Sequence, residues 1–148
     1  MSIEISIITD KTAQNEALSI RKTVFVGEQG VPLALETDEH EEQSTHFIAR
    51  MNGYPAGTLR FRWLSKELGK VERVAVLSQY RGARIGVALM QAVEDYAHQQ
   101  GALQIKLSAQ TNALPFYTKL GYQEVGSPYM DAGIEHITMG KSLTSEKV

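Results

Sequence analysis

The segment from residue 71 to residue 100 constrains the fold of this chain most, because a strand-like pattern passes through a glycine-bearing turn into a helix-like pattern. Residues 69–77, "GKVERVAVL", are largely apolar, which favours a central strand. After the turn "SQYRGAR", one helical stripe runs through Ile85, Leu89, Val93 and Tyr96, and Gly101 is a typical helix end. A strand, a turn and a helix in this order predict a crossover unit of a domain that mixes helices and strands.

The residues before this unit predict three strands and a helix. Alternating isoleucines indicate a first strand that ends near Asp10, and residues 11–26 form an amphipathic pattern with Thr12 as the expected N-cap. Residues 27–45 contain glycines, a proline and many acids, which indicates a loop or a short second helix. The pair Asn52-Gly53 between two alternating runs is a hairpin signal.

The residues after the unit predict a strand over 103–109, a short helix over 112–121 capped by Asn112, and two strands over 122–126 and 136–143. The expected order is β-α-(α)-β-β-β-α-β-α-β-β, an α+β fold with a mixed sheet. A chain of 148 residues suits one domain, here residues 1–143, with residues 144–148 expected to be a frayed tail.

Composition excludes several functional classes. With 15 basic and 17 acidic residues the net charge is −2, so a nucleic-acid-binding protein is not expected. Without cysteine there is no disulfide, thiolate metal site or cysteine nucleophile. The N-terminus is too short and acidic for a signal peptide, and no apolar run is long enough to span a membrane, so we expect a cytoplasmic protein.

The turn at residues 78–84 suits an anion site, because a helix start presents unpaired N–H groups and the positive end of its dipole. Arg81 and Arg84 add cations. A glycine-bearing turn can equally be structural, and both alternatives stay open at this point.

Three competing motifs fail on spacing. A dinucleotide-binding loop needs a third glycine in addition to Gly82 and Gly86. The tripeptide Gly140-Lys141-Ser142 is similar to the end of a P-loop, but a P-loop needs glycine five positions before Gly140, where Glu135 stands. His40 and His46 lie six residues apart rather than four, so they do not form a zinc-protease pair, and no metal site is expected.

Two blocks of the sequence resemble the GNAT superfamily of N-acetyltransferases. "VERVAVLSQYRGARIGVALM" resembles the strand and loop motif R/Q-x-x-G-x-G/A, and "TNALPFYTKLGYQEVG" resembles the later N-x-x-A-x-x-F-Y block, with Pro115 before the aromatic pair. The segments "RKTVFVGEQGVP" and "GIEHITMGK" further resemble a small bacterial YjcF/ElaA-like branch. The resemblance spans nearly the whole chain.

This resemblance implies a splayed sheet that binds acetyl-CoA between the fourth and fifth strands, without a metal. It implies that main-chain groups of the fourth strand contact the pantetheine arm, that the following loop holds the pyrophosphate, and that two later residues complete the cofactor site. These residues are Val74, Ala75 and Val76; Arg81, Gly82, Ala83, Arg84, Ile85, Gly86 and Val87; and Asn112 and Phe116. Tyr117 is expected near the thioester sulfur.

Acetyl transfer to an amine needs a base, because an ordinary lysine-like amine with a pKa near 10.4 is about 4.6 kcal/mol from its neutral form at pH 7. Glu72 is the first candidate, and Glu28 and His136 are alternatives on the acceptor side, where Gln29 is also expected. Glu72 could instead be a strand residue paired with an arginine such as Arg60 or Arg73.

The expected acceptor is a primary amine of a small molecule or peptide, and the acidic run 36–43 either attracts a cationic acceptor or is an ordinary solvated surface. The N–H of Val76 is the expected oxyanion donor. The rival hypothesis is a non-catalytic acyl-CoA-binding or regulatory module, a third is transfer of a longer acyl group, and a homodimer is a family-level expectation.

Arg84 stands where many relatives have glycine. Because a left-handed conformation costs a non-glycine residue about 1–2 kcal/mol, we expect Arg84 to have a negative φ. Its side chain either reaches a CoA phosphate, the option we favour, or lies in solvent.

Overall fold

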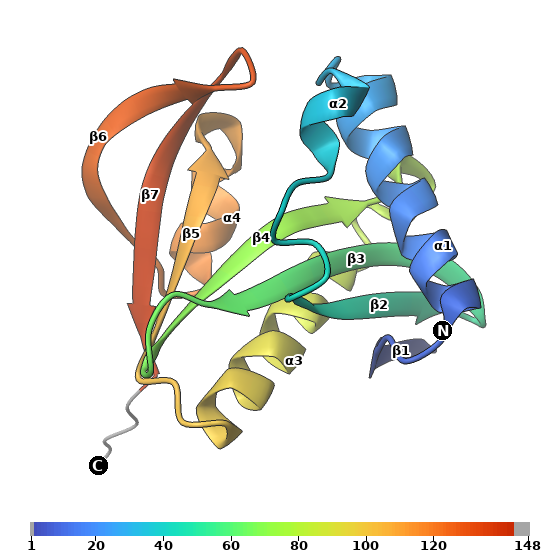
Figure 1. The fold of residues 1–148 in the computed structure, drawn as a ribbon, viewed down its shortest axis with the longest axis horizontal. Helices are drawn as coiled ribbons and strands as arrows, with labels where there is room; N and C mark the ends of the chain where they lie inside the picture. Colours follow the sequence, from blue (N-terminus) through green and yellow to red (C-terminus); the bar gives the residue numbers. More distant parts are fainter. Residues whose placement is uncertain (1, 144–148) are drawn as a thin grey trace.

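The computed structural model describes residues 2–143 and has an α+β fold built on a seven-stranded mixed sheet. The strand order is β1-β2-β3-β4-β5-β7-β6 (Figure 1). The strands are β1 (Ile3–Ile7), β2 (Thr45–Met51), β3 (Tyr54–Trp63), β4 (Leu68–Val76), β5 (Gln104–Gln110), β6 (Gln123–Asp131) and β7 (Ile134–Ser142). The α-helices are α1 (Lys11–Arg21), α2 (Leu33–Glu36), α3 (Ile85–Gln99) and α4 (Leu114–Lys119). The predicted fold class and order of elements are confirmed.

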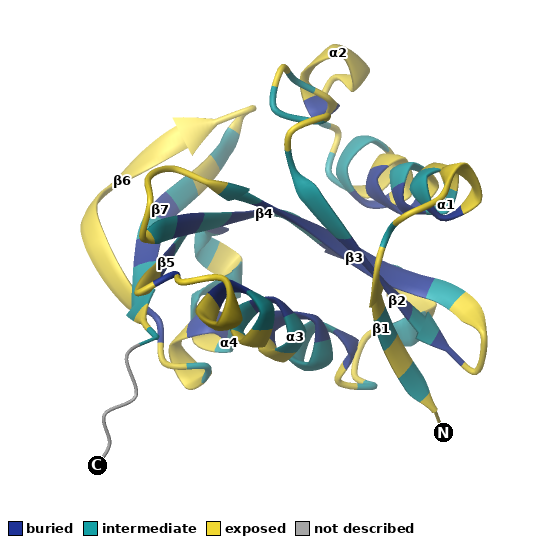
Figure 2. Cartoon of the chain, turned by 60° about the horizontal axis from the view of Figure 1, so that its bottom comes forward, coloured by how far each residue is buried: buried dark blue, intermediate teal, exposed yellow. Residues whose placement is uncertain are grey.

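Helices lie on both faces of the sheet, and the larger hydrophobic core lies on only one of them. Helices α1 and α2 lie on one face, and α3 and α4 lie on the other (Figure 2). The main core lies between the sheet and α3, whose Leu89 and Val93 are fully buried. Gly57 on β3 lets α3 approach closely, since a Cβ there would lie 3.0 Å from Cγ2 of Ile85. This contact fixes the start of α3 against the sheet.

The sheet splits between β4 and β5. These parallel strands pair only over residues 68–71 and 104–107. Beyond Val71, β4 carries a bulge at which the register with β3 shifts, and Arg73 there has a φ of 55°. A bulge bends its strand, so β4 turns away from β5 while it stays paired with β3. The expected splay between the fourth and fifth strands is therefore confirmed.

The first helix differs from the prediction in its cap and in its end. Asp10 is the N-cap instead of Thr12, and its Oδ1 accepts a 2.8 Å hydrogen bond from the N–H of Ala13. The α-helix stops at Arg21 and continues as a π-helix, Lys22–Glu28. The wider turn redirects the chain toward the mouth of the β4–β5 gap, and π-turns often lie at functional sites.

The predicted hairpin is present, with positive φ angles at Asn52 and Gly53. The predicted cap of the last helix is wrong: Ala113 is the N-cap of α4, and Asn112 lies in a preceding 3₁₀ turn and does not cap it. The β6–β7 hairpin is longer than expected, and β6 is exposed along its whole length (Figure 2). The expected frayed tail, residues 144–148, lies outside the described residues.

Within residues 2–143, no helix has both the length and the apolar character needed to cross a lipid bilayer.

Candidate active site

The split sheet opens into a cleft of about 890 Å³. One wall is β4, and the other is formed by β5, the 3₁₀ turn after it and the β6–β7 hairpin. The end of the π-helix and α2 close the side above the sheet. Nine of the predicted site residues line this cleft: Gln29, Glu72, Val74, Ala75, Val76, Arg81, Asn112, Tyr117 and His136.

The β4 edge of the cleft has free main-chain groups. The N–H of Leu77 donates to Ala56 O on the β3 side at 2.9 Å. Main-chain groups alternate sides along a strand, so those of Val76 and Val74 point into the gap, whereas Ala75 pairs toward β3. A linear ligand with amide groups could add to this edge like a strand.

The turn after β4 carries the anion-site geometry. Among the described residues, no hydrogen-bond acceptor is present for the main-chain N–H groups of Gly82, Arg84, Ile85, Gly86 and Val87. These donors lie at the start of the 15-residue helix α3, where the dipole favours an anion. The turn therefore combines free N–H groups with the exposed cations Arg81 and Arg84.

The expected negative φ of Arg84 is wrong. Arg84 is the N-cap of α3 with φ 67° and ψ 23°, a left-handed conformation. Its carbonyl accepts from the N–H of Ala88 at 3.0 Å, the first hydrogen bond of the helix. The turn geometry thus imposes the glycine-type conformation on an arginine, at a cost of about 1 kcal/mol.

Gly86 and Phe116 have a packing role that sequence reasoning missed. A Cβ at Gly86 would lie 3.1 Å from Cζ of Phe116, so glycine lets α4 pack against the start of α3. Neither residue lines the cleft, and neither do residues 82–87 as a group. The packing joins the anion turn to the helix that carries Tyr117.

Tyr117 is buried in the wall of the cleft. Its ring packs edge-on against Phe116 and Tyr122, and burial raises the pKa of its hydroxyl to about 12. The phenol is therefore neutral at pH 7 and can donate a hydrogen bond. Asn112 lies nearby in sequence, exposed at the cleft.

Three hydrogen bonds link the elements around the mouth of the gap. Arg81 donates from Nε to Val76 O at 3.0 Å and from Nη2 to Glu28 at 2.7 Å. Gln110 on β5 donates to Gln29 at 2.7 Å. Glu28 does not itself line the cleft, but Arg81 connects it to the β4 edge. A ligand that pairs with Val76 must displace Arg81 from that carbonyl.

Glu72 is held by three cations. It accepts from Nε of Arg60 at 3.0 Å and from Nε of Arg62 at 2.9 Å, and Nζ of Lys70 lies 3.3 Å away. Burial alone would raise the pKa of Glu72, but the hydrogen bond from Arg62 and the charges of Arg60 and Lys70 lower it to about 2. The paired alternative that the sequence left open is the observed one, and a carboxylate this acidic is a weak base.

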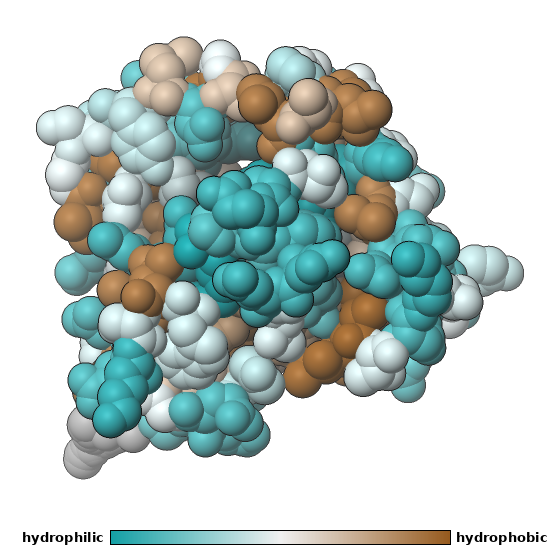
Figure 3. All heavy atoms as spheres, viewed as in Figure 1, coloured by the Kyte–Doolittle hydropathy of each residue, from teal (hydrophilic) through white to brown (hydrophobic). Residues whose placement is uncertain are grey.

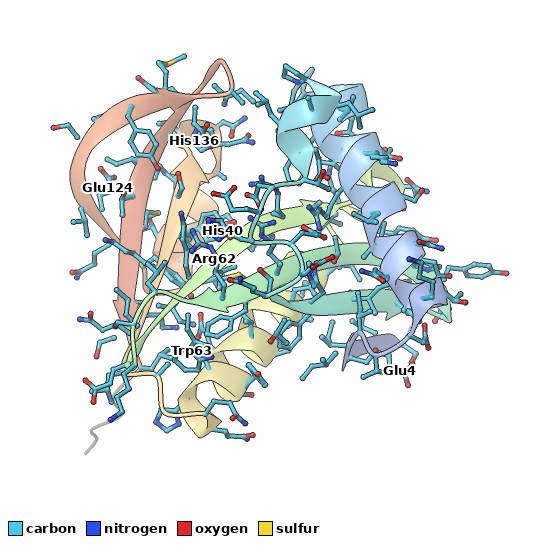
Figure 4. The ribbon with its side chains drawn as sticks, in the orientation of Figure 1. Glu4, His40, Arg62, Trp63, Glu124 and His136 are labelled. Atoms are coloured by element: carbon cyan, nitrogen blue, oxygen red, sulfur yellow. The ribbon has the colours of Figure 1, made fainter. Side chains whose placement is uncertain are left out.

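His136 has the chemistry of a base. Its Nδ1 lies 2.7 Å from the carbonyl oxygen of Ile134, and since a carbonyl only accepts, Nδ1 carries the proton. In the neutral ring, Nε2 is then an acceptor. The ring stacks on Tyr129, whose hydroxyl hydrogen-bonds Ser108 on β5. Figure 4 shows His136 on the β5–β7 side of the gap and His40 and Arg62 on the β3–β4 side.

A buried ionic network was also missed by sequence reasoning. Arg21 of α1 pairs with Glu36 at 2.6 Å and with Glu41 at 2.7 Å. Arg60 of β3, fully buried, pairs with Asp38, Glu41 and Glu72 at 2.8–2.9 Å. The alternating arginines of β3 can be read from the sequence. Their acidic partners cannot, because they lie in a loop about 20 residues away.

Comparison with known proteins identifies relatives over almost the whole chain. The family model described as "Acetyltransferase (GNAT) domain" matches residues 8–143. A Bacillus subtilis (strain 168) protein named "Uncharacterized N-acetyltransferase YjcF" is 41% identical over 127 residues, covering 85% of this chain and 90% of that protein. An acyl-CoA N-acyltransferase from Pseudomonas aeruginosa is 26% identical with a TM-score of 0.82, covering 95% of this chain and 99% of that one. Escherichia coli ElaA has the same fold, with a TM-score of 0.83 at 24% identity and coverage of 95% and 99%.

Proposed function

Because the chain belongs to the GNAT acetyltransferase family, we propose that it is an acetyl-CoA-dependent N-acetyltransferase that acetylates a primary amine of a small molecule or peptide. One observation carries the proposal: the β4 edge at Val74 and Val76, which no strand pairs on the gap side, leads to unpaired N–H groups at the start of α3. A pantetheine arm with two amides and a pyrophosphate needs these two kinds of donor in this order.

In this proposal the anion turn and the β4 edge hold the donor. The free main-chain N–H groups of Gly82 and of residues 84–87 bind the pyrophosphate, while Val74 and the carbonyl of Val76 pair with the pantetheine amides and Asn112 supplies a side-chain contact. Arg81 leaves Val76 O when the arm enters, and its guanidinium is then free for a phosphate. Glu28 loses its ion pair in the same step.

Transfer proceeds by direct attack on the thioester. Nε2 of His136, directly or through water, accepts a proton from the amine, and the amine nitrogen forms a bond to the acetyl carbon. The N–H of Val76 faces the gap and stabilises the oxyanion of the tetrahedral intermediate. The carbon–sulfur bond then breaks, the amide product forms, and the thiolate of CoA leaves.

Tyr117 stabilises that thiolate by a hydrogen bond. Taking the thiol pKa near 8.5 and the Tyr117 pKa at about 12, full proton transfer from the phenol is unfavourable by roughly 5 kcal/mol. Solvent therefore supplies the final proton, and the phenol stays neutral.

The second candidate is a non-catalytic acyl-CoA-binding or regulatory module. The ion pairs of Glu72 favour it. Glu72 is the first expected base, but it is paired with cations that lower its pKa to about 2, so it accepts a proton poorly. Such a module would keep the donor site and bind acetyl-CoA without turnover.

Release of free CoA thiol from acetyl-CoA, measured over a library of amines, separates the two functions. Amine-dependent release, with an acetylated product identified by mass spectrometry, supports the enzyme. Saturable acetyl-CoA binding by calorimetry without release for any amine supports the module, and no binding refutes both. Longer acyl-CoA donors in the same assay test the acyl length. The expected homodimer and the cytoplasmic location remain predictions for light scattering and cell fractionation.

A further inference from the structure

The acceptor face of the cleft floor has a cationic pair that the acetyl donor does not use. Arg62 on β3 and Lys70 on β4 are direct partners in the sheet and both line the cleft. They lie beside Val71, at the closed end of the split where β4 still pairs with β5. Their side chains are 19% and 27% exposed, so both can reach a ligand.

These two cations share a single acid. Within residues 2–143, Glu72 is the acidic partner of both Arg62 and Lys70, and the same carboxylate also pairs with buried Arg60. Arg62 is held by Glu72 through Nε at 2.9 Å, but its Nη2 lies 3.4 Å from that carboxylate and Nζ of Lys70 lies 3.3 Å from it, which are long distances for charge-assisted hydrogen bonds. The pair therefore keeps donor capacity for a second anion.

The acids around the acceptor space are mostly neutralised by other cations. Glu36 and Glu41 pair with Arg21, and Asp38 pairs with Arg60. The hydrogen bond from Arg60 holds the pKa of Asp38 well below its usual value, so this acid stays committed to its partner. Figure 3 shows the hydrophilic patch that this segment makes at the centre of the face. Glu36, Asp38 and Glu41 of the acidic run 36–43 are thus held by arginines and offer little to a cationic acceptor, whereas Glu39 and Glu42 are exposed outside these ion pairs.

We propose that the acceptor is an amine that also carries a compact anionic group, a carboxylate or a phosphate, and that Arg62 and Lys70 bind this group and set specificity. The inference rests on the proposed acetyltransferase function. An arginine and a lysine side by side bind planar or tetrahedral oxyanions through several charge-assisted hydrogen bonds. With the anion at the floor, the amine of the same molecule extends along the cleft toward the thioester and His136.

Matched acceptors test the anion requirement. Leucine is compared with leucinamide, and ethanolamine phosphate with ethanolamine, at saturating acetyl-CoA. We expect at least tenfold higher kcat/KM for the member that carries the anionic group than for its partner without it, and the preferred pair distinguishes carboxylate from phosphate. Equal kcat/KM within both pairs overturns the anion site and leaves the acetyltransferase function intact.

Matched variants test the residues. Lys70→Gln and Arg62→Gln are each expected to raise KM about tenfold for the acceptor with the anionic group, with little change in kcat or in KM for the acceptor without it. Lys66→Gln, an equal charge loss at an exposed position in the same hairpin and outside the cleft, should change neither. If all three variants behave alike, Arg62 and Lys70 are not the anion site.

A binding measurement keeps the inference separate from catalysis. N-acetyl-leucine and N-acetyl-ethanolamine phosphate, with their uncharged counterparts, are titrated into protein saturated with CoA. Binding of a charged compound that Lys70→Gln weakens, without turnover of any amine, supports the anion site and refutes the proposed enzyme. If neither charged compound binds better than its counterpart, the anion site is refuted.

Discussion

The proposed donor end and the proposed acceptor end of the cleft are built from different parts of the chain. The donor end, from Val74 to the start of α3, comes from one continuous segment and presents mainly main-chain groups. The acceptor end combines α2, β3, β4 and the β6–β7 hairpin, and presents side chains held by ion pairs between distant segments. Main-chain chemistry suits a ligand common to a family, whereas side-chain chemistry can change with the acceptor.

Arg73 connects the two ends. At the bulge, its Nε donates to the carbonyl of Glu36 at 2.9 Å, and Nη2 lies 3.4 Å from Asp38. The residue that helps to bend β4 away from β5 thus also holds α2 above the cleft. Changes at the acceptor end are therefore expected to alter stability and acceptor use, while changes at the donor end alter acetyl-CoA binding and turnover.

The largest effect is expected from Arg60→Met, which removes the centre of the ionic network. Asp38, Glu41 and Glu72 would lose their buried partner, so unfolding free energy should fall by about 3–5 kcal/mol. Arg50→Met is the control, since within residues 2–143 Arg50 forms its ion pair with Glu16 alone, at a partly exposed site, and its loss should cost about 1 kcal/mol or less. Equal losses in urea unfolding would show that the network is not what holds the acceptor end.

His136→Asn should lower kcat about 100-fold or more and leave the Kd for acetyl-CoA nearly unchanged, because it removes the proposed base. The acidic limb of the pH–rate profile should disappear with it. His98→Asn, at an exposed position on α3, is the control. A normal pH profile in the His136 variant would assign the base to another group.

Acid should destabilise the acceptor end. The pKa of Glu72 is about 2 in the folded protein against an ordinary value of 4.5, so its contribution is present above pH 4.5 and is lost as pH falls toward 2. With allowance for solvent screening, the loss is about 2 kcal/mol. In Glu72→Gln, the unfolding free energy from urea titrations should depend less on pH between 4.5 and 2. An unchanged pH dependence would contradict the assigned ion pairs.

Tyr117→Phe should slow turnover about tenfold, since it removes one hydrogen bond to the leaving thiolate. The Kd for acetyl-CoA should stay within twofold. Tyr54→Phe, at an exposed residue next to the β2–β3 turn, gives the background for a hydroxyl loss. An unchanged kcat at saturating donor removes Tyr117 from the mechanism.

Arg84→Gly should raise the unfolding free energy by about 1 kcal/mol, because glycine has the observed φ of 67° without strain. Gln91→Gly, inside the same helix, should instead lower it by about 1 kcal/mol. If Arg84 binds a CoA phosphate, the Arg84→Gly variant should also bind CoA more weakly, and its CoA affinity should depend less on salt concentration. Unchanged affinity and unchanged salt dependence would show that the Arg84 side chain lies in solvent and does not contact CoA.

Local patterns of the sequence predicted β4, the turn after it and α3 well. The apolar strand, the turn and the helical stripe follow from short-range periodicity, and their place in the family follows from motif order. The φ of Arg84 could not be predicted from the residue type, because the turn geometry overrides a preference of only about 1 kcal/mol.

The acceptor end depended on long-range contacts that no local pattern encodes. The pairs between Arg60 and Asp38 and between Arg21 and Glu41 join residues about 20 positions apart. The sequence did provide both outcomes for Glu72, a base or an ion-paired strand residue, but only the fold shows which cations surround it. The π-helix after Arg21 likewise has no sequence signal that we recognise.

Amide hydrogen exchange followed by NMR, with and without acetyl-CoA, tests the central claim most directly. The claim predicts saturable binding that slows exchange of the gap-facing amides of Val74 and Val76 and of the free amides at residues 84–87. The amide of Leu77, already bonded to Ala56, should change much less. Binding without protection of these amides, or protection confined to β1 and β2, would contradict the assignment of the β4–β5 split as the acetyl-CoA site.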